Sequence, residues 1–312
     1  MTVDSAPAAQ IRRTELSTFL RTRRERLDPT ELGLPPGTRR RTPGLRREEV
    51  AQLAGVGVTW YTWLEQGRRI NASTQVLDAI AKTLRLDQTE HEHLYRLADV
   101  PGLMVRSEPE SSFEPGARRI LDEIKSPAFI GNERYDVLAW NSAYRDLFPF
   151  RFTGSTRLRN TLWCVFTMPS CCGPVINADQ ELPMMVATFR ASYSRHVGEP
   201  AWEELIAELS AASAKFREMW ADHNVAGHVT LTKRFRHHAV GELTFTSVSM
   251  QLQATPGNRI VVYLPADVET TEMMRRLAEG SVPVPARLPC GHPNLPGNSK
   301  RVSEGSVVGQ VW

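Results

Sequence analysis

The chain of 312 residues has few cysteines and no long apolar segment. Cys164, Cys171, Cys172 and Cys290 are irregularly spaced, which argues against a secreted disulfide framework. No apolar run approaches the roughly 18 residues that a membrane span requires, and residues 1–10 lack the charged and apolar regions of a signal peptide. We therefore expect a cytoplasmic protein that has no membrane partner.

The sequence also lacks the usual signatures of catalysis and metal binding. It contains no Gly-x-Ser-x-Gly motif, and no carboxylate pair indicates acid–base work. Neither Cys-x-x-Cys nor His-x-x-x-His spacing occurs, although four histidines lie close together in the sequence: His223, His228, His237 and His238. The sequence thus predicts no catalytic residues, no metal site and no cofactor.

Residues 47–67 contain two short apolar segments separated by a tight turn. Ala51 is small where two helices would touch, and Gly55 can adopt the positive φ that the turn between them requires. Gly67 would end the second helix. The apolar faces that close the pair are Val50, Ala54, Val56, Tyr61 and Leu64. This spacing predicts a helix-turn-helix, which makes double-stranded operator DNA the first partner to consider.

Arginine is concentrated around this motif. Between residues 11 and 50 there are eleven arginines and six acidic residues, a local excess of five, whereas the whole chain has a net charge of +3. A local basic face beside a groove-reading helix is typical of duplex binders. A hairpin that serves only packing would leave these arginines unexplained. The predicted phosphate contacts are Arg40, Arg41, Arg46, Arg47 and Arg68.

The start of the second helix is the part that should meet base edges in the major groove. Val58 and Thr59 offer methyl groups suited to thymine, and the Thr62 hydroxyl can pair with several bases. Trp63 completes the predicted base-reading set. Because one such domain has few base-reading groups, we expect a homodimer that bridges two half-sites roughly one helical turn apart.

The length requires a second domain beyond a helix-turn-helix unit. We predict an all-α repressor-like domain of five helices over residues 14–98, with Ser73 and Asp87 as N-caps, and a linker over 99–116. Residues 117–266 place strands before and after a group of helices, which indicates an α+β domain with an antiparallel sheet. A helix over 267–279 and a disordered tail over 280–312 complete the expected organisation.

Two motifs in the first domain, residues 39–51 and 60–68, resemble the signature of MmyB-like bacterial transcription regulators, within the repressor-like (Cro/C1 or XRE) class. Residues 135–141, 210–225 and 236–244 are similar to segments of the ligand-binding domain of that family. The resemblance covers roughly 117–266 and implies a PAS-like fold that senses a fatty-acid-like ligand. The chain departs from the family at His238, where a proline is expected, and over residues 167–174.

The aromatic and methionine content between residues 140 and 220 suits an apolar pocket with one polar end. Each buried methylene gains about 0.8 kcal/mol, whereas a buried carboxylate must be paired. Arg190, on the helix of Met184 and Phe189, is the predicted partner, with a surface arginine as an equal alternative. The predicted ligand-binding residues are Trp140, Asn141, Phe189, Arg190, Phe216 and Trp220, although this aromatic stripe also fits an ordinary core.

The sequence therefore predicts a transcription regulator, not an enzyme, that binds operator DNA and responds to a small amphiphilic ligand. Two alternatives remain. A redox-sensing regulator would use Cys164, Cys171 and Cys172, because a vicinal pair can react with oxidants when it is exposed. An enzyme with a DNA-binding appendage would require a catalytic constellation in a cleft.

Overall fold

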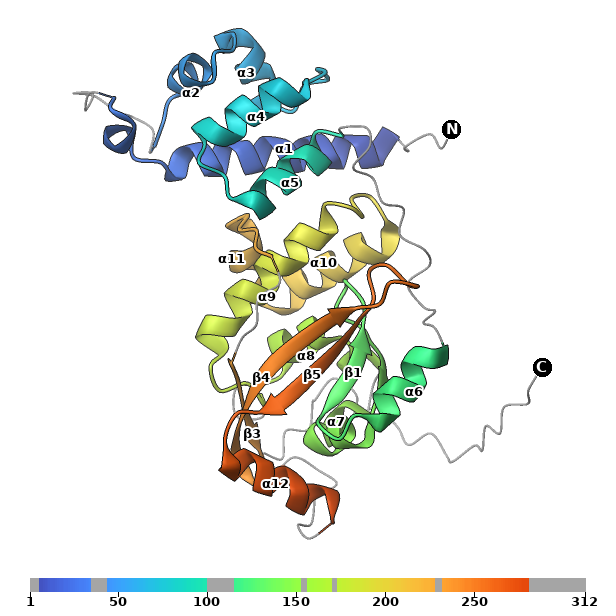
Figure 1. Cartoon of the computed structure of the whole chain (residues 1–312). Helices are drawn as coiled ribbons and strands as arrows, with labels where there is room; N and C mark the ends of the chain where they lie inside the picture. Colours follow the sequence, from blue (N-terminus) through green and yellow to red (C-terminus); the bar gives the residue numbers. More distant parts are fainter. Residues whose placement is uncertain are drawn as a thin grey trace.

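The protein, seen in a computed structural model, consists of a helical lobe and a larger sheet lobe (Figure 1). The structure describes residues 6–34, 44–99, 115–152, 156–169, 173–227 and 232–280. The helical lobe comprises residues 6–99 of this set, and the sheet lobe comprises residues 115–280. The predictions for Arg40, Arg41, Cys171 and Cys172, for most of the linker and for nearly all of the tail lie outside the described residues.

The helical lobe contains the five predicted helices. They are α1 (Ala6–Arg26), α2 (Arg47–Ala54), α3 (Val58–Glu65), α4 (Thr74–Thr83) and α5 (Gln88–Leu97), and a 3-10 turn covers Pro29–Leu32. Helix α1 begins at Ala6, well before residue 14, where the predicted domain starts. Ser73 and Asp87 cap α4 and α5 by accepting hydrogen bonds from the backbone N–H of Val76 and Glu90. Both predicted caps are confirmed.

Helices α2 and α3 form the predicted helix-turn-helix. Gly55 ends α2 in the left-handed conformation at φ 67°. A Cβ at Gly55 would meet no atom within 4 Å, so backbone conformation rather than space favours glycine there. Ala51 is fully buried where the helices approach, and Tyr61 and Leu64 of α3 are buried in the same core.

The sheet lobe contains one five-stranded antiparallel sheet in the order β2-β1-β5-β4-β3. The strands are β1 (Ala128–Gly131), β2 (Val137–Trp140), β3 (Thr232–His237), β4 (Gly241–Gln251) and β5 (Arg259–Pro265). The chain thus combines an all-α helix-turn-helix lobe with an α+β lobe, as the sequence predicts. Central β5 pairs with β1 through Phe129 and Val261, so the first and last thirds of the lobe meet at the middle of the sheet.

Helices cover both faces of the sheet (Figure 1). The helices of this lobe are α6 (Pro115–Glu123), α7 (Ser142–Leu147), α8 (Thr161–Thr167), α9 (Ala178–Tyr193), α10 (Pro200–Ala212), α11 (Ala214–Ala221) and α12 (Val268–Ala278), with 3-10 turns at Pro149–Phe152 and Thr156–Arg159. Leu121 of α6 packs with Ile130 and Val262 on one face, and Tyr144 of α7 packs with Phe129 and Tyr263 on the other. Helix α8, which the sequence analysis missed, begins at the N-cap Asn160.

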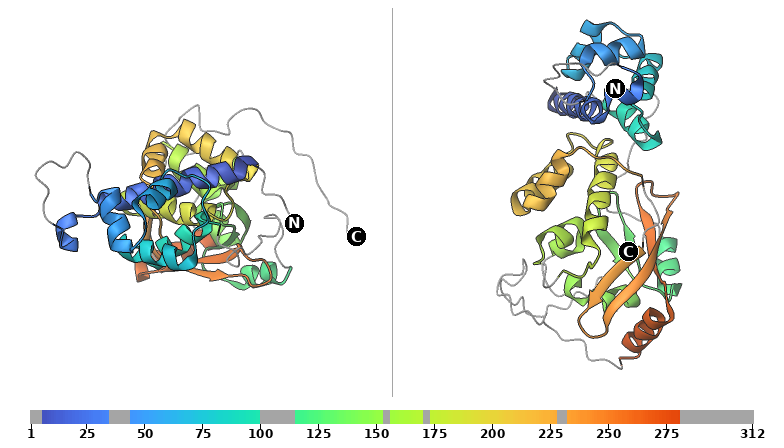
Figure 2. Two further views of the ribbon diagram at one scale, coloured as in Figure 1. Left: turned by 90° about the horizontal axis from the view of Figure 1, so that it is seen from above. Right: turned by 90° about the vertical axis from the view of Figure 1, so that its left-hand side faces the viewer.

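The two lobes pack against each other through helices (Figures 1 and 2). Helices α1 and α5 lie on the end of the sheet lobe that carries α9, α10 and α11, and apolar residues of both lobes belong to one buried cluster. Any Cβ at Gly198 would lie 2.4 Å from the Cβ of Ala8, so glycine allows α1 to approach closely. The Arg23 guanidinium donates to the His223 carbonyl at 2.7 Å. Within the described ranges, no helix is both long and apolar enough to cross a membrane.

A buried ion pair holds α3 within the helical lobe. Glu65 accepts hydrogen bonds from Arg24 of α1 at 2.7 and 2.9 Å and from Arg47 of α2 at 2.9 Å. Burial alone would raise the pKa of the Glu65 carboxyl, but the two arginines outweigh burial and the pKa lies below its usual value. The orientation of α3 therefore depends on a charge cluster that joins three helices.

Replacing Glu65 by glutamine is expected to lower the free energy of unfolding by about 3–5 kcal/mol, because it leaves buried Arg24 without its counter-charge. The matched control is Glu31→Gln, which weakens an exposed pair with Arg85 and should cost less than about 1 kcal/mol. Urea unfolding of the full chain, followed by circular dichroism, measures both losses. Equal losses would contradict the structural role of the Glu65 cluster.

Candidate functional site

One face of α3 remains open. Val58 is 44% exposed, Trp63 is 39% exposed and Thr59 is also exposed, whereas Thr62 is half-buried. Helix α3 lies at the end of the helical lobe that faces away from the sheet lobe (Figure 1). The structure thus brings the four predicted base-reading residues together on a surface that the rest of the chain leaves accessible.

Three of the predicted phosphate contacts lie at the ends of this motif. Arg46 is the N-cap of α2, and the Arg68 guanidinium lies 5.7 Å from the centre of the Trp63 ring, beside the open face. The Arg47 side chain is 42% exposed, but its Nε is bound to Glu65. Arg47 therefore also has a structural role, and its contact with phosphate stays a prediction.

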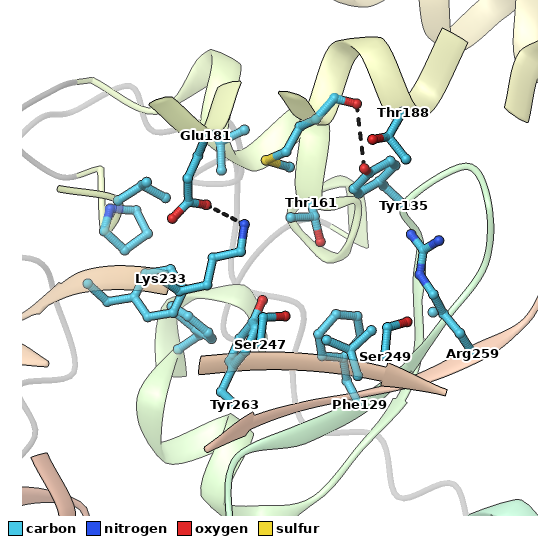
Figure 3. Close-up of a pocket in the computed structure, with 18 of the residues that line it drawn as sticks. Phe129, Tyr135, Thr161, Glu181, Thr188, Lys233, Ser247, Ser249, Arg259 and Tyr263 are labelled. Atoms are coloured by element: carbon cyan, nitrogen blue, oxygen red, sulfur yellow. Dashed lines mark hydrogen bonds and ion pairs between the residues drawn. The ribbon is translucent and has the colours of Figure 1, made fainter. Parts of the chain in front are cut away.

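A pocket of about 200 Å³ lies between the sheet and the helices α8 and α9 (Figure 3). Its wall combines aromatic, valine and methionine side chains with a similar number of polar residues. The lining includes Phe129, Phe148, Val165, Val175, Met184, Met185, Phe235 and Val261, and the polar residues Tyr135, Arg151, Thr161, Glu181, Thr188, Lys233, Ser247, Ser249, Arg259 and Tyr263. A wall that offers apolar side chains together with polar groups can hold a small molecule and fix its orientation.

Two of the cationic side chains that line this pocket, Lys233 and Arg259, lie against other side chains of the protein (Figure 3). The Lys233 ammonium lies 2.5 Å from a carboxylate oxygen of Glu181, whose other oxygen is buried without a hydrogen bond among the described residues. Burial raises the pKa of Glu181, although Lys233 opposes that shift. The Arg259 guanidinium lies 5.3 Å from the centre of the Tyr135 ring.

Arg151 is the third cation of the pocket, and the sequence analysis missed it. Its side chain is buried, at 3% exposure, beneath the Phe148 ring at 5.1 Å. Its Nη1 donates to the Thr161 hydroxyl at 3.2 Å, and its Nε has no hydrogen-bond partner among the described residues. A signal was available: Arg151 falls between Phe148, Phe150 and Phe152, where a solvated arginine would be unusual.

None of the six predicted ligand-binding residues lines this pocket. Trp140 stacks on Phe152 with ring centres 4.2 Å apart. The Asn141 side chain caps α7 at Tyr144 and also accepts a hydrogen bond from the backbone of Ala128, so it fixes the connection between strand and helix. Phe189, Phe216 and Trp220 pack in the buried cluster between α9, α10 and α11. The aromatic stripe forms core here, which was the alternative reading of the sequence.

Arg190 points away from the pocket, contrary to the placement predicted at its mouth. The residue is fully buried, and its Nη1 lies 2.6 Å from a carboxylate oxygen of Glu15 in α1 and 3.0 Å from Nδ1 of His223. The reason is helical geometry. Each residue advances about 100° around a helix, so Arg190 lies on the side of α9 opposite Met184 and Thr188, which line the pocket. Its guanidinium therefore joins the two lobes.

His223 stays neutral in this contact. Burial, followed by the charge of Arg190, lowers the pKa of His223 to about 3. A neutral Nδ1 can then accept a hydrogen bond from Arg190. The contact between lobes thus combines one carboxylate, one guanidinium and one neutral imidazole.

The described residues offer little for redox or metal chemistry. The Cys164 thiol is buried 3.3 Å from the sulfur of Met168, and burial raises its pKa. A raised pKa lowers the thiolate fraction that reacts with oxidants. No group of three or more histidine, cysteine, aspartate or glutamate residues in the described ranges is placed to hold a metal ion.

Each of the two lobes matches the model of a known domain family. A helix-turn-helix domain model matches residues 15–94, and the MmyB-like transcription regulator ligand binding domain matches residues 113–277. The chain belongs to the MmyB-like transcription regulators. A search among curated proteins found no match. A DNA-binding helix-turn-helix joined to a ligand-binding domain makes this MmyB-like protein a ligand-responsive transcription regulator.

The depressed pKa of His223 predicts a specific acid sensitivity. The unfolded chain binds a proton at His223 below about pH 6.5, whereas the folded chain does so only near pH 3. His223 therefore lowers the free energy of unfolding by up to about 1.4 kcal/mol per pH unit as pH falls through this window.

His223→Asn should make the pH dependence shallower between pH 6 and pH 4. Asparagine keeps an acceptor for Arg190 and tolerates the left-handed backbone at φ 52°. Chemical unfolding at several pH values measures the slope, with His91→Asn on the surface of α5 as the control. An unchanged slope in His223→Asn would contradict the neutral state assigned to His223.

Proposed function

We propose that this regulator binds a small amphiphilic, fatty-acid-like molecule in the pocket beneath α9, and that binding changes its affinity for a specific DNA operator. The observation that carries the proposal is the position of α9. One side of this helix lines the pocket with Met184, Met185 and Thr188, and the opposite side contacts the helical lobe through Arg190.

The lining of the pocket supports an amphiphile. Phenylalanine, valine and methionine side chains supply apolar wall for a hydrocarbon tail, and each methylene buried there contributes about 0.8 kcal/mol. Lys233, Arg259 and Arg151 supply positive charge in the same wall. Such a combination favours a ligand with a long apolar part and one polar or charged end.

The open face of α3 supports sequence-specific DNA binding. Val58, Thr59, Thr62 and Trp63 would enter the major groove, while Arg46, Arg47 and Arg68 meet phosphates. We also propose a homodimer on two half-sites roughly one helical turn apart, because a single lobe presents few groups to the bases.

Thr59→Ala and Thr62→Ala are expected to change the sequences that the protein selects from a random DNA pool, because contacts to base edges are lost. The control is Arg68→Gln. It should weaken binding to all sequences alike and reduce the slope of log affinity against log salt by about 0.9. An unchanged sequence preference in both threonine variants would remove α3 from base reading.

A second cavity brings the pocket close to the helical lobe. It shares Thr188, Ser249 and Arg259 with the pocket, and α5 contributes Thr89, Glu92 and Arg96 to its wall. A ligand that moves α9 or these shared side chains would change how α1 and α5 pack on the sheet lobe. Binding affects DNA affinity only if the ligand prefers one arrangement of the two lobes.

Arg190→Met should separate ligand binding from the DNA response. The variant is expected to bind decanoic acid with wild-type affinity, because Arg190 faces away from the pocket, yet its operator affinity should no longer respond to the ligand. Wild-type operator affinity should change about 5-fold or more at saturation. Calorimetry and fluorescence anisotropy measure the two quantities.

Glu15→Gln serves as a second variant at the same contact, because it keeps the shape of Glu15 and removes only its charge. Its response to decanoic acid should also be smaller than that of wild type. Glu31→Gln, in an exposed pair of the same lobe, should respond like wild type. Full responses in both contact variants would exclude coupling through this contact, and loss of decanoic acid binding in Arg190→Met would restore Arg190 as a ligand contact.

A further inference from the structure

We propose that Arg151 binds the anionic head of the ligand, so that the pocket selects anionic amphiphiles over neutral ones of the same length. This inference rests on the proposed function, because it assumes that the pocket beneath α9 holds the ligand. The sequence predicted that Arg190 would pair with the charged end of the ligand. The proposal gives this role to Arg151 instead.

Arg151 differs from the other buried arginines of the described residues. Four of the five have a carboxylate partner within 3.0 Å: Arg12 with Asp99, Arg23 with Glu90, Arg24 with Glu65, and Arg190 with Glu15. Arg151 is as buried as these and lacks such a partner among the described residues. Since arginine remains protonated in proteins and a buried charge is costly unless paired, a ligand anion would complete this site.

The position of Arg151 in the pocket wall also favours an anion site. Arg151 lines the pocket, and its Nη1 donates a hydrogen bond to the hydroxyl of Thr161, which also lines it. While Thr161 accepts this bond, its own O–H is free to donate to an acceptor in the cavity. The guanidinium and the hydroxyl therefore offer several donors to one anionic oxygen group. Phe148 and Tyr263 complete this part of the wall, and apolar surroundings strengthen charge-assisted hydrogen bonds.

The other two cations of the pocket are placed less well for this role. The charge of Lys233 is balanced by Glu181 at 2.5 Å. Arg259 is half-buried, lies against the Tyr135 ring and belongs to both cavities. Arg151 alone combines burial, a hydrogen-bonding neighbour in the wall and an unsatisfied Nε.

The test compares decanoic acid, decyl phosphate and 1-decanol by calorimetry on the full chain, for wild type, Arg151→Met and Arg259→Met. Wild type should bind at least one of the two anions at least about tenfold more tightly than the alcohol, as a charge-assisted hydrogen bond implies. The preferred anion distinguishes a carboxylate from a phosphate head. Arg151→Met should lose the preference through weaker anion binding while its affinity for decanol is unchanged, and Arg259→Met should keep it.

The ligand-free protein gives an independent measurement. Arg151→Met should melt at or above the wild-type temperature, because the substitution removes an unpaired buried cation and keeps an apolar side chain of similar length. A variant that unfolds or melts markedly lower would show that Arg151 is structural and would overturn the proposal. Equal binding of acid, phosphate and alcohol by wild type, or an undiminished preference in Arg151→Met, would overturn it as well.

The anion site and the proposed function can fail separately. If wild type binds none of the three decyl compounds, sensing of a fatty-acid-like amphiphile is excluded. The same three proteins are then titrated with benzoate and benzyl alcohol. Tighter binding of benzoate that depends on Arg151 supports an anion site for a shorter ligand, and the absence of that difference overturns the proposal.

Discussion

The packing of helix α9 between the pocket and the helical lobe is the constraint on which the rest of the structure depends. Met184, Met185 and Thr188 form part of the pocket wall, whereas Arg190, on the opposite side, is held by Glu15 of α1. Because the same helix makes both contacts, its pocket side lies about one helix diameter from the helical lobe. The buried cluster that includes Phe19 of α1 and Phe189 of α9 reinforces this arrangement.

Among the residues that the structure describes, four of the five buried arginines have a carboxylate partner and one does not. Arg24 binds Glu65 to fix α3, and Arg190 binds Glu15 to join the lobes, so each of these buried guanidinium groups has a carboxylate counter-charge. Arg151, in the wall of the pocket, is the one without a carboxylate partner among the described residues. A buried charge without a counter-charge weakens stability, so its presence in a pocket wall points to a role in function.

Sequence reasoning succeeded where the signal is local and failed where it depends on which side of a helix faces a cavity. The positive φ of Gly55 and the caps Ser73 and Asp87 can be predicted from neighbouring residues alone. These local signals predicted the helix-turn-helix, and the pattern of strands predicted the antiparallel sheet. Helix α8 was missed because its seven residues show too few turns for a clear period. The prediction assigned ligand contacts to an aromatic stripe, but in the structure these side chains belong to the hydrophobic core.

The sequence by itself determined the family, the two lobes and the four residues on the open face of α3, because short motifs encode these features within a few turns of chain. Only the tertiary structure decided the partners of the buried arginines. Glu15 and Arg190 are far apart in the chain, and no local pattern indicates that they meet. The same holds for the pocket, whose wall draws on β1, β3, β4, β5, α8 and α9, so its chemistry exists only after the sheet and helices have packed.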